Sequence, residues 1–249
     1  MDRSLILALI PAWNEDCRLA SVVKATAERL PVLVVDDGSE DETAAVAQRA
    51  GATVVSHGQN RGKGAALMTG FDWALSQGYE AVLTLDADGQ HDPDDIPKFL
   101  EAYRSGMWDL IIGKRDFSEM PFPRGYTNPF GSWLLSKTLG QRIPDNQSGF
   151  RLHDRGFLEV LEVTSTGFEL EVEVIVQAVC AGMRIGWVEI RTIYGIDKTS
   201  YFRPVKDSLR FLATVWHACR QRRAASPNSG RTAEAQRPQA EAVDSSSRQ

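Results

Sequence analysis

Short apolar runs alternate with longer amphipathic stretches along the first half of the chain. Each run has the length of a buried strand and is bounded by turn residues. Five such strands are expected, at residues 5–10, 32–35, 53–55, 81–85 and 110–113. The segments between them carry apolar residues at helical spacing, which predicts helices over residues 18–30, 41–50, 65–76 and 93–104. This alternation predicts an α/β fold with a mostly parallel central sheet flanked by helices.

The second half of the chain is less regular. Residues 116–130 are rich in Pro, Phe and Gly and predict a mobile loop, and residues 145–152 predict a second, polar loop. Helices are expected at residues 133–139, 156–161 and 168–181, and a strand at 185–194. An amphipathic helix is expected over about residues 204–223, with Pro204 at its first position. Residues 1–223 would then form one domain, and the polar residues 224–249 a disordered tail.

Composition excludes several classes of protein. A net charge of −5 and a pI near 5.5 argue against a nucleic-acid partner, which selects a basic surface. Three scattered cysteines match neither a zinc site nor a disulfide framework, and they indicate a reducing compartment. No signal peptide is recognisable, and no apolar run reaches the ~18 residues that span a bilayer. We therefore expect a cytoplasmic protein, either soluble or peripheral at the cytoplasmic face of a membrane.

Two carboxylates end the predicted strand at residues 81–85. Side chains alternate along a strand, so Asp86 and Asp88 would leave on the same face, and Gly89 permits a sharp turn before Gln90 and His91. Carboxylate and amide oxygens are ligands for Mg²⁺ and Mn²⁺, and Mg²⁺ sites commonly use one or two carboxylates together with substrate phosphates. The alternative is a solvated acidic loop without a ligand.

Further polar clusters favour a site. Residues 11–16, 36–39 and 86–91 each follow a predicted strand, and ligands of α/β sheets bind beside the carboxyl ends of the strands. The glycine-rich loop at residues 58–64 lacks the Walker A spacing. It serves either to pack a helix on the sheet or to bring Lys63 near a nucleotide.

Six motifs occur in order: Pro11-Ala12-Trp13-Asn14-Glu15, Asp36-Asp37-Gly38-Ser39, Asn60-Arg61-Gly62-Lys63-Gly64, Asp86-Ala87-Asp88-Gly89-Gln90-His91, Gly113-Lys114-Arg115 and Gln147-Ser148-Gly149-Phe150-Arg151. Together they resemble family 2 glycosyltransferases of the dolichyl/polyprenyl-phosphate mannosyltransferase (dolichol-phosphate-mannose synthase) type. The resemblance covers about residues 4–215. It implies a GT-A fold, which is a Rossmann-like nucleotide-diphospho-sugar transferase fold. It also implies inverting transfer of mannose or glucose from GDP-mannose or UDP-glucose to a polyprenyl or dolichyl phosphate.

The resemblance also implies roles for individual residues. Asp88 and Gln90 would hold Mg²⁺ or Mn²⁺, and Arg124 and Asn128 would bind the acceptor phosphate. Asp88, Arg115 and Arg124 would be the catalytic residues. The nucleotide-sugar would contact Pro11, Trp13, Glu15, Asp37, Lys63, Asp86, Ala87, Asp88, Arg115 and Lys198. Tyr194 departs from the family pattern, because many relatives carry an arginine near this position.

Three questions stay open at the level of sequence. An acceptor hydroxyl would need a carboxylate base, for which Glu169, Glu171 and Asp145 are candidates, whereas an acceptor phosphate is already ionised. The helix at residues 204–223 could pack on the core or lie on a membrane surface. The rival functions are transfer to a hydroxyl acceptor, nucleotidyl transfer, and a catalytically silent module that binds nucleotide-sugar or lipid.

Overall fold

A computed structural model describes residues 5–119, 124–163, 165 and 169–193. Its sheet contains strands β1 Ile6–Ala12, β2 Val32–Asp36, β3 Thr53–Ser56, β4 Ala81–Thr84, β5 Leu110–Arg115, β6 Arg151–Asp154 and β7 Ile185–Ile190. Its α-helices are α1 Asp16–Ala27, α2 Thr43–Arg49, α3 Lys63–Ser76, α4 Ile96–Arg104, α5 Arg124–Leu139, α6 Arg155–Leu158 and α7 Leu170–Cys180. Two 3₁₀ turns, Pro93–Asp95 and Phe117–Glu119, precede α4 and α5. The predicted helix at 204–223 and tail at 224–249 lie outside the described residues.

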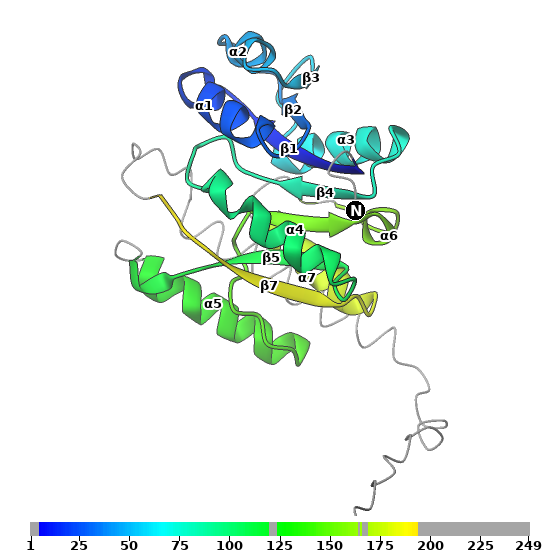
Figure 1. The fold of residues 1–249 in the computed structure, drawn as a ribbon. Helices are drawn as coiled ribbons and strands as arrows, with labels where there is room; N and C mark the ends of the chain where they lie inside the picture. Colours follow the sequence, from blue (N-terminus) through cyan, green and yellow to red (C-terminus); the bar gives the residue numbers. More distant parts are fainter. Residues whose placement is uncertain (1–4, 120–123, 164, 166–168, 194–249) are drawn as a thin grey trace, which may run out of the picture.

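The sheet has seven strands in the order β3-β2-β1-β4-β6-β5-β7 (Figure 1). Every neighbouring pair is parallel except those that involve β6, which runs antiparallel to both β4 and β5. This arrangement confirms the predicted α/β class and the mostly parallel sheet. The polar segments that follow β1, β2 and β4 are thereby brought to one edge of the sheet.

Alternation along the strands divides the core into two layers. In β1, Leu7 and Leu9 belong to one apolar cluster, whereas Ile6, Ala8 and Ile10 belong to the other. The first cluster packs against α3, α5, α6 and α7, and the second packs against α1, α2 and α4. The sheet is therefore buried on both faces, which explains why its strands read as continuous apolar runs.

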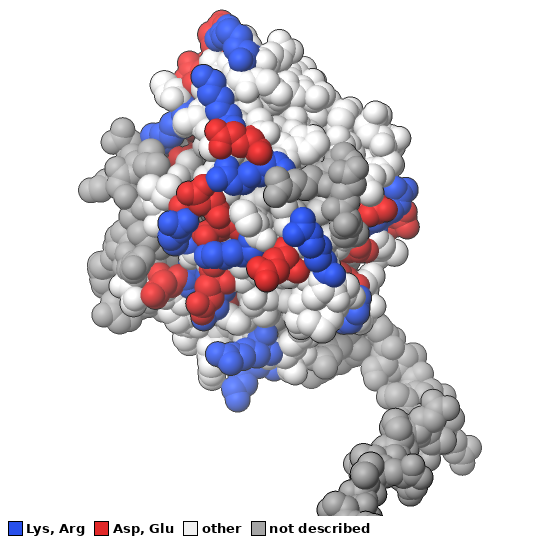
Figure 2. Space-filling view, in the orientation of Figure 1, with Lys and Arg blue, Asp and Glu red and all other residues white. Residues whose placement is uncertain are grey.

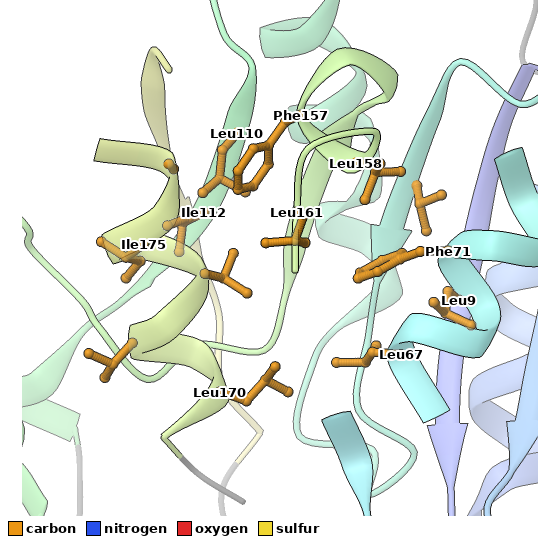
Figure 3. Packing of buried hydrophobic residues seen from close by; sticks show 14 of the residues in the cluster. Leu9, Leu67, Phe71, Leu110, Ile112, Phe157, Leu158, Leu161, Leu170 and Ile175 are labelled. Atoms are coloured by element: carbon orange, nitrogen blue, oxygen red, sulfur yellow. The ribbon is translucent and has the colours of Figure 1, made fainter. Parts of the chain in front are cut away.

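Close approach of helix α3 to the sheet depends on glycine. Figure 3 shows Leu67 and Phe71 of α3 beside Leu9 of β1. A Cβ added at Gly70 would lie 2.3 Å from a methyl carbon of Leu9. Since such a distance is far inside van der Waals contact, a larger residue would force the Leu9 side chain or the helix to move. The glycine lets α3 begin directly beside the end of β4.

Two expectations for the second half of the chain were wrong. Residues 124–130 belong to helix α5 rather than to a loop, and residues 151 and 152 start strand β6 rather than continuing a polar loop. An arginine at the start of β6 hid the strand, because its burial depends on partners distant in sequence. In the part of the chain that the structure describes, no helix is both long and apolar enough to cross a bilayer.

The His153 ring lies in the core between two aromatic rings. Its centroid is 5.1 Å from that of Phe71 and 6.2 Å from that of Phe157, and its Nδ1 is 3.3 Å from the carbonyl oxygen of Val82. Burial, reinforced by the nearby Arg151 charge, lowers the pKa of His153 from 6.5 to about 3. The folded protein therefore keeps this ring neutral at pH values where the unfolded chain protonates it.

We predict a loss of stability as the pH falls below 6.5, the ordinary pKa of the group. Between pH 7 and pH 5 this one histidine should lower the free energy of unfolding by about 2 kcal/mol, because only the unfolded state binds the proton. Urea denaturation at the two pH values tests this, with His153→Phe as the comparison. An equal pH dependence in the two proteins would contradict the prediction.

Candidate active site at the end of strand β4

The side chain of Asp86 leaves the end of β4 and meets an ammonium group from the start of α3. Lys63 Nζ lies 2.7 Å from Asp86 Oδ1 and 2.7 Å from Glu171 Oε1. Glu171 comes from α7 and its side chain is only 7% exposed, while that of Lys63 is 32% exposed. One lysine thus joins the glycine-rich loop, the tip of β4 and α7 into one polar cluster.

Electrostatics keeps this cluster charged. Burial alone would raise the pKa of Asp86, but the Lys63 and His91 charges hold it well below its usual range. Burial alone would lower the pKa of Lys63, and the two carboxylates raise it instead. The carboxylate and the ammonium group are therefore both ionised at neutral pH, and each stabilises the other.

His91 and Gly149 hold the Asp86 carboxylate from its other sides. The Asp86 backbone N–H donates to His91 Nδ1 at 3.2 Å, and His91 Nε2 lies 3.8 Å from Asp86 Oδ2. Burial lowers the pKa of His91, with the nearby acids opposing the shift. A Cβ at Gly149 would come within 2.6 Å of Asp86 Oδ2, so glycine leaves room for the carboxylate. The carboxylate is thereby held in a defined position.

Asp88 follows on the turn and is less compensated. Its Oδ1 accepts a hydrogen bond from the Gln90 backbone N–H at 3.0 Å. Burial raises the pKa of Asp88, and the negative charge of Asp86 raises it further. Burial also raises the pKa of Glu15, with Asp88 and Asp86 adding to the shift. Three carboxylates therefore repel one another here, an arrangement that a bound cation would relieve.

The side-chain oxygens at this site fit a divalent cation whose remaining ligands come from a bound substrate. Among the described residues, no group of three or more His, Cys, Asp or Glu side chains is gathered closely enough to hold a metal ion. Mg²⁺ does not need such a cluster, because it is commonly held by one or two protein oxygens together with oxygens of substrate phosphates. The carboxylate of Asp88 and the half-buried side chain of Gln90 are suitable ligands.

Arg115, at the end of β5, is held by a buried acid. Its Nε and one Nη donate to the two carboxylate oxygens of Asp145 at 2.7 and 2.9 Å. Asp145 is fully buried and also accepts from the Gln147 backbone N–H at 3.0 Å. This bidentate pair fixes the plane of the guanidinium group. Asp145 is thus a positioning partner for Arg115 and is a poor candidate for a general base.

Arg151 lies beneath these groups; the sequence placed it in a family motif but assigned it no role. It is buried and donates to the carbonyl oxygens of Ser148 at 2.6 Å and Glu171 at 2.7 Å. Burial lowers its pKa to about 10, while Glu171, Asp145 and Asp86 act in the opposite direction. Its place between two apolar residues, Phe150 and Leu152, and at the end of the motif Gln147–Arg151 was the signal for such a role.

Asp37, expected to line the nucleotide, lies beneath the glycine-rich loop. The side chain is buried and accepts from the backbone N–H groups of Arg61 at 3.0 Å and Gly62 at 2.7 Å. It also bonds His57 Nδ1 at 2.6 Å, and His57 Nε2 lies 3.0 Å from the Thr69 hydroxyl. Asp37 therefore positions the loop that carries Lys63. The role of His57 was missed because nothing local in the sequence indicates its partners.

The loop after β1 is tied to the loop after β2. Asn14 has a positive φ of 54°, and its backbone N–H donates to Ser39 Oγ at 2.9 Å while its Oδ1 accepts from the Glu40 N–H at 2.9 Å. The neighbouring Trp13 is 42% exposed, whereas Ala87 is buried. The Trp13 indole therefore lies partly exposed at this edge of the sheet.

The remaining predicted residues are less fully described. Arg124 and Asn128 lie in the first turns of α5, but the structure does not describe their side chains. Lys198 lies outside the described residues, as does Tyr194. The structure therefore brings together Asp86, Asp88, Glu15, Lys63 and Glu171 from segments far apart in sequence.

Comparison with known proteins now gives the family. The model for Glycosyl transferase family 2 matches residues 8–161. The chain belongs to this family. A glucosyl-3-phosphoglycerate synthase from Mycobacterium tuberculosis, solved with Mn²⁺, uridine-diphosphate and phosphoglyceric acid, has a TM-score of 0.70 at 22% identity. The match covers 91% of this chain and 81% of that chain, and it confirms the GT-A fold.

Curated relatives of this family 2 glycosyltransferase act on lipid phosphates, according to their names. Polyprenol monophosphomannose synthase of Mycolicibacterium smegmatis is 33% identical over 204 residues, covering 74% of this chain and 76% of the relative. Undecaprenyl-phosphate mannosyltransferase of Micrococcus luteus is 31% identical over 201 residues, covering 74% and 82%. UDP-N-acetylglucosamine--dolichyl-phosphate N-acetylglucosaminyltransferase of Methanococcus voltae is 30% identical over 220 residues, covering 78% and 88%. The expected resemblance to polyprenyl-phosphate sugar transferases is therefore confirmed.

We predict that Lys63→Met destabilises the protein by about 2 kcal/mol, because it leaves Glu171 as a buried charge without its partner. The double variant Lys63→Met/Glu171→Gln should recover part of that loss, since the uncompensated charge is removed. Denaturant unfolding measures both. Lys114→Met, which breaks an exposed pair with Glu189, is the control and should change stability by less than about 0.5 kcal/mol. Equal losses for the two lysine variants would contradict the role given to Lys63.

Proposed function

We propose that this protein is an inverting hexosyltransferase that moves mannose or glucose from a nucleotide-sugar to a polyprenyl or dolichyl phosphate, with Mg²⁺ or Mn²⁺ as cofactor. The observation that carries the proposal is the acid pair Asp86 and Asp88 after β4, with Asp86 bound by Lys63, in a chain about 30% identical to polyprenyl-phosphate sugar transferases. The protein would act at the cytoplasmic face of a membrane, where such acceptors are presented.

The donor would lie across the carboxyl ends of β1, β2 and β4. The exposed Trp13, with Pro11 and Glu15, would contact the base and ribose. Asp86, Ala87 and Asp88 would face the ribose and diphosphate. Asp37 and Lys63 would act by shaping this surface, since their polar groups already bind the loop and the two acids. Lys198, which lies outside the described residues, is proposed as a further contact of the nucleotide-sugar.

Asp88 and Gln90 would hold the cation. When bound, Mg²⁺ or Mn²⁺ stabilises the negative charge that develops on the leaving diphosphate. Binding would also relieve the repulsion that raises the pKa of Asp88. Arg115 would add charge-assisted hydrogen bonds to the diphosphate while Asp145 keeps its guanidinium plane in position. Preorganised positive groups of this kind are often the largest contribution to catalysis.

The reaction would be a single displacement. An oxygen of the acceptor phosphate attacks the anomeric carbon of the sugar from the side opposite the diphosphate. The new C–O bond forms as the bond to the β-phosphate oxygen breaks, and that oxygen takes the electron pair. The sugar is inverted and the nucleoside diphosphate leaves. Arg124 and Asn128 are proposed to bind the acceptor phosphate at the start of α5.

The geometry favours a phosphate acceptor over a hydroxyl acceptor. A hydroxyl would need a carboxylate to take its proton. Of the three candidate bases, Glu171 is buried against Lys63 and Asp145 is buried against Arg115, whereas Glu169, directly before α7, is half-buried. A phosphate oxygen is already ionised, so it needs positioning rather than deprotonation. Transfer to a hydroxyl, as the names of the glucosyl-3-phosphoglycerate synthases suggest for those proteins, is the second candidate.

The test is transfer of radiolabelled sugar into an organic phase. Protein, Mn²⁺ and polyprenyl phosphate are incubated with GDP-mannose or with UDP-glucose. One donor should label the lipid, and chelation of the metal should abolish labelling. Asp88→Asn should lower the rate at least about a hundredfold, because the leaving diphosphate loses a metal ligand.

Asp94→Asn is the matched control. Asp94 is an exposed acid that also follows β4, and it forms an ion pair with Arg29. Its rate should stay within about twofold of the wild type, since an exposed ion pair contributes little to stability. If neither donor labels the lipid, and phosphoglycerate offered as the acceptor is labelled, the second candidate would replace the proposal.

A further inference from the structure

The turn that carries Asp88 and Gln90, here called the metal turn (residues 88–91), is tied to the segment that follows strand β7. The Ile193 backbone N–H donates to the carbonyl oxygen of Gln90 at 3.0 Å, and His91 and Thr192 form an antiparallel bridge. The Gln90 N–H donates to Asp88 Oδ1. Both polar backbone groups of Gln90 are therefore bonded, which fixes the backbone from which its side chain projects.

Asp95 anchors this segment from the start of α4. It ends the 3₁₀ turn Pro93–Asp95, and its side chain is fully buried. Asp95 Oδ2 accepts from the Arg191 backbone N–H at 2.7 Å, and Lys98 Nζ lies 2.7 Å from Asp95 Oδ1. A buried carboxylate is costly unless it is paired and hydrogen-bonded, and here both oxygens have a positively polarised partner. The carboxylate thus joins the start of α4 to the residue just before Thr192.

Further polar contacts support the same junction. Lys98 Nζ also donates to the Glu189 carbonyl oxygen of β7 at 3.0 Å, and the Arg191 guanidinium lies 3.1 Å from Asp92 Oδ2. Asp92 in turn accepts from the Asp94 N–H at 2.9 Å, which caps the 3₁₀ turn. Figure 1 shows α4 lying along β7, and in the space-filling view acidic and basic side chains lie beside one another over this face (Figure 2). The metal turn is therefore attached to a well-connected part of the fold.

Sheet pairing does not reach residues 191–193. The register of β7 with β5 ends where Ile190 lies opposite Arg115. Beyond Ile190, the backbone hydrogen bonds of the segment go to Asp95 and to the metal turn. The position of this segment therefore depends on Asp95 rather than on the sheet.

We propose that Asp95 is a positioning residue for the divalent cation. By holding the Arg191 backbone, it keeps residues 191–193 against the metal turn, and this pairing sets the direction in which Gln90 offers its amide oxygen. Asp95 acts through this series of contacts and is not itself a cation ligand. Groups that orient metal ligands commonly contribute tenfold or more to metal affinity. The inference rests on the proposed function only in that Asp88 and Gln90 hold a cation.

Mn²⁺ binding to the full chain tests the role of Asp95. The paramagnetic resonance signal of free Mn²⁺ measures its dissociation constant in the presence of saturating GDP or UDP. Asp95→Ala should raise that constant at least about tenfold. Asp95→Asn keeps an oxygen that can accept from the Arg191 N–H, so it should raise the constant by a smaller factor, about threefold. Arg191→Gln keeps the backbone N–H and removes only ion pairs of an exposed side chain, so its effect should stay below about twofold.

Tyr103→Phe is the control for a general loss of stability. Tyr103 lies near the other end of α4, and its buried hydroxyl donates to Asp154 Oδ2 at 2.7 Å. This variant should unfold at a lower denaturant concentration and bind Mn²⁺ like the wild type. Asp94→Asn, which removes the exposed acid next to Asp95, should also leave the dissociation constant within about twofold.

The outcomes separate this inference from the proposed function. If the wild type binds Mn²⁺ and both Asp95 variants bind it equally well, or if Tyr103→Phe weakens binding as much as Asp95→Ala does, the inference is overturned alone. A wild type that binds no Mn²⁺ with either nucleotide would overturn it together with the proposed cation site. Mn²⁺ binding that depends on Asp95, in a protein that transfers no sugar, would support the inference and refute the proposed function.

Discussion

The ion pairs of Lys63 with Asp86 and Glu171 connect most parts of the site. The lysine stands at the first position of α3, one carboxylate follows β4 and the other belongs to α7, so a single ammonium group ties three distant segments together. The close fit of Gly70 against Leu9 lets α3 lie where this contact forms. Below it, Arg151 binds the backbone of α7 at Glu171. The position of Asp86 is thus set by the packing of the whole sheet.

This support leaves the site with an imbalance of charge. Asp86 is compensated by Lys63, whereas Asp88 and Glu15 stay close to it with pKa values raised by burial and repulsion. A folded protein keeps such repulsion where binding offsets it, and a cation with a diphosphate ligand would do so. Arg115, whose side chain is mostly buried, supplies positive charge and is oriented by Asp145. The acids that would hold a cation and the oriented arginine together suit a reaction in which negative charge moves onto a leaving group.

The strands of the first half, their parallel order and the clustering of polar loops followed from apolar runs alone, because both faces of the sheet are buried. The same reasoning missed β6, where Arg151 interrupts the apolar pattern and donates to backbone carbonyl oxygens that only the fold brings near it. It also missed the first turns of α5, since Pro129 and two glycines concealed a helix that tertiary packing stabilises. The acid pair could be singled out from the sequence because its spacing is local. The contacts of Asp37 with His57, Arg61 and Gly62, which support the glycine-rich loop, join separate segments and could not be read locally.

The central claim is that the acids at the end of β4 bind a divalent cation together with a nucleoside diphosphate. Thermal unfolding in the presence of GDP or UDP, with and without Mn²⁺, tests it most directly, because a ligand that binds only the folded state raises the melting temperature. One nucleotide should raise the melting temperature by several degrees at about a hundredfold excess over its dissociation constant, and only when Mn²⁺ is present. Asp88→Ala should abolish that shift. Equal shifts with and without the metal, or a variant that responds like the wild type, would contradict the account.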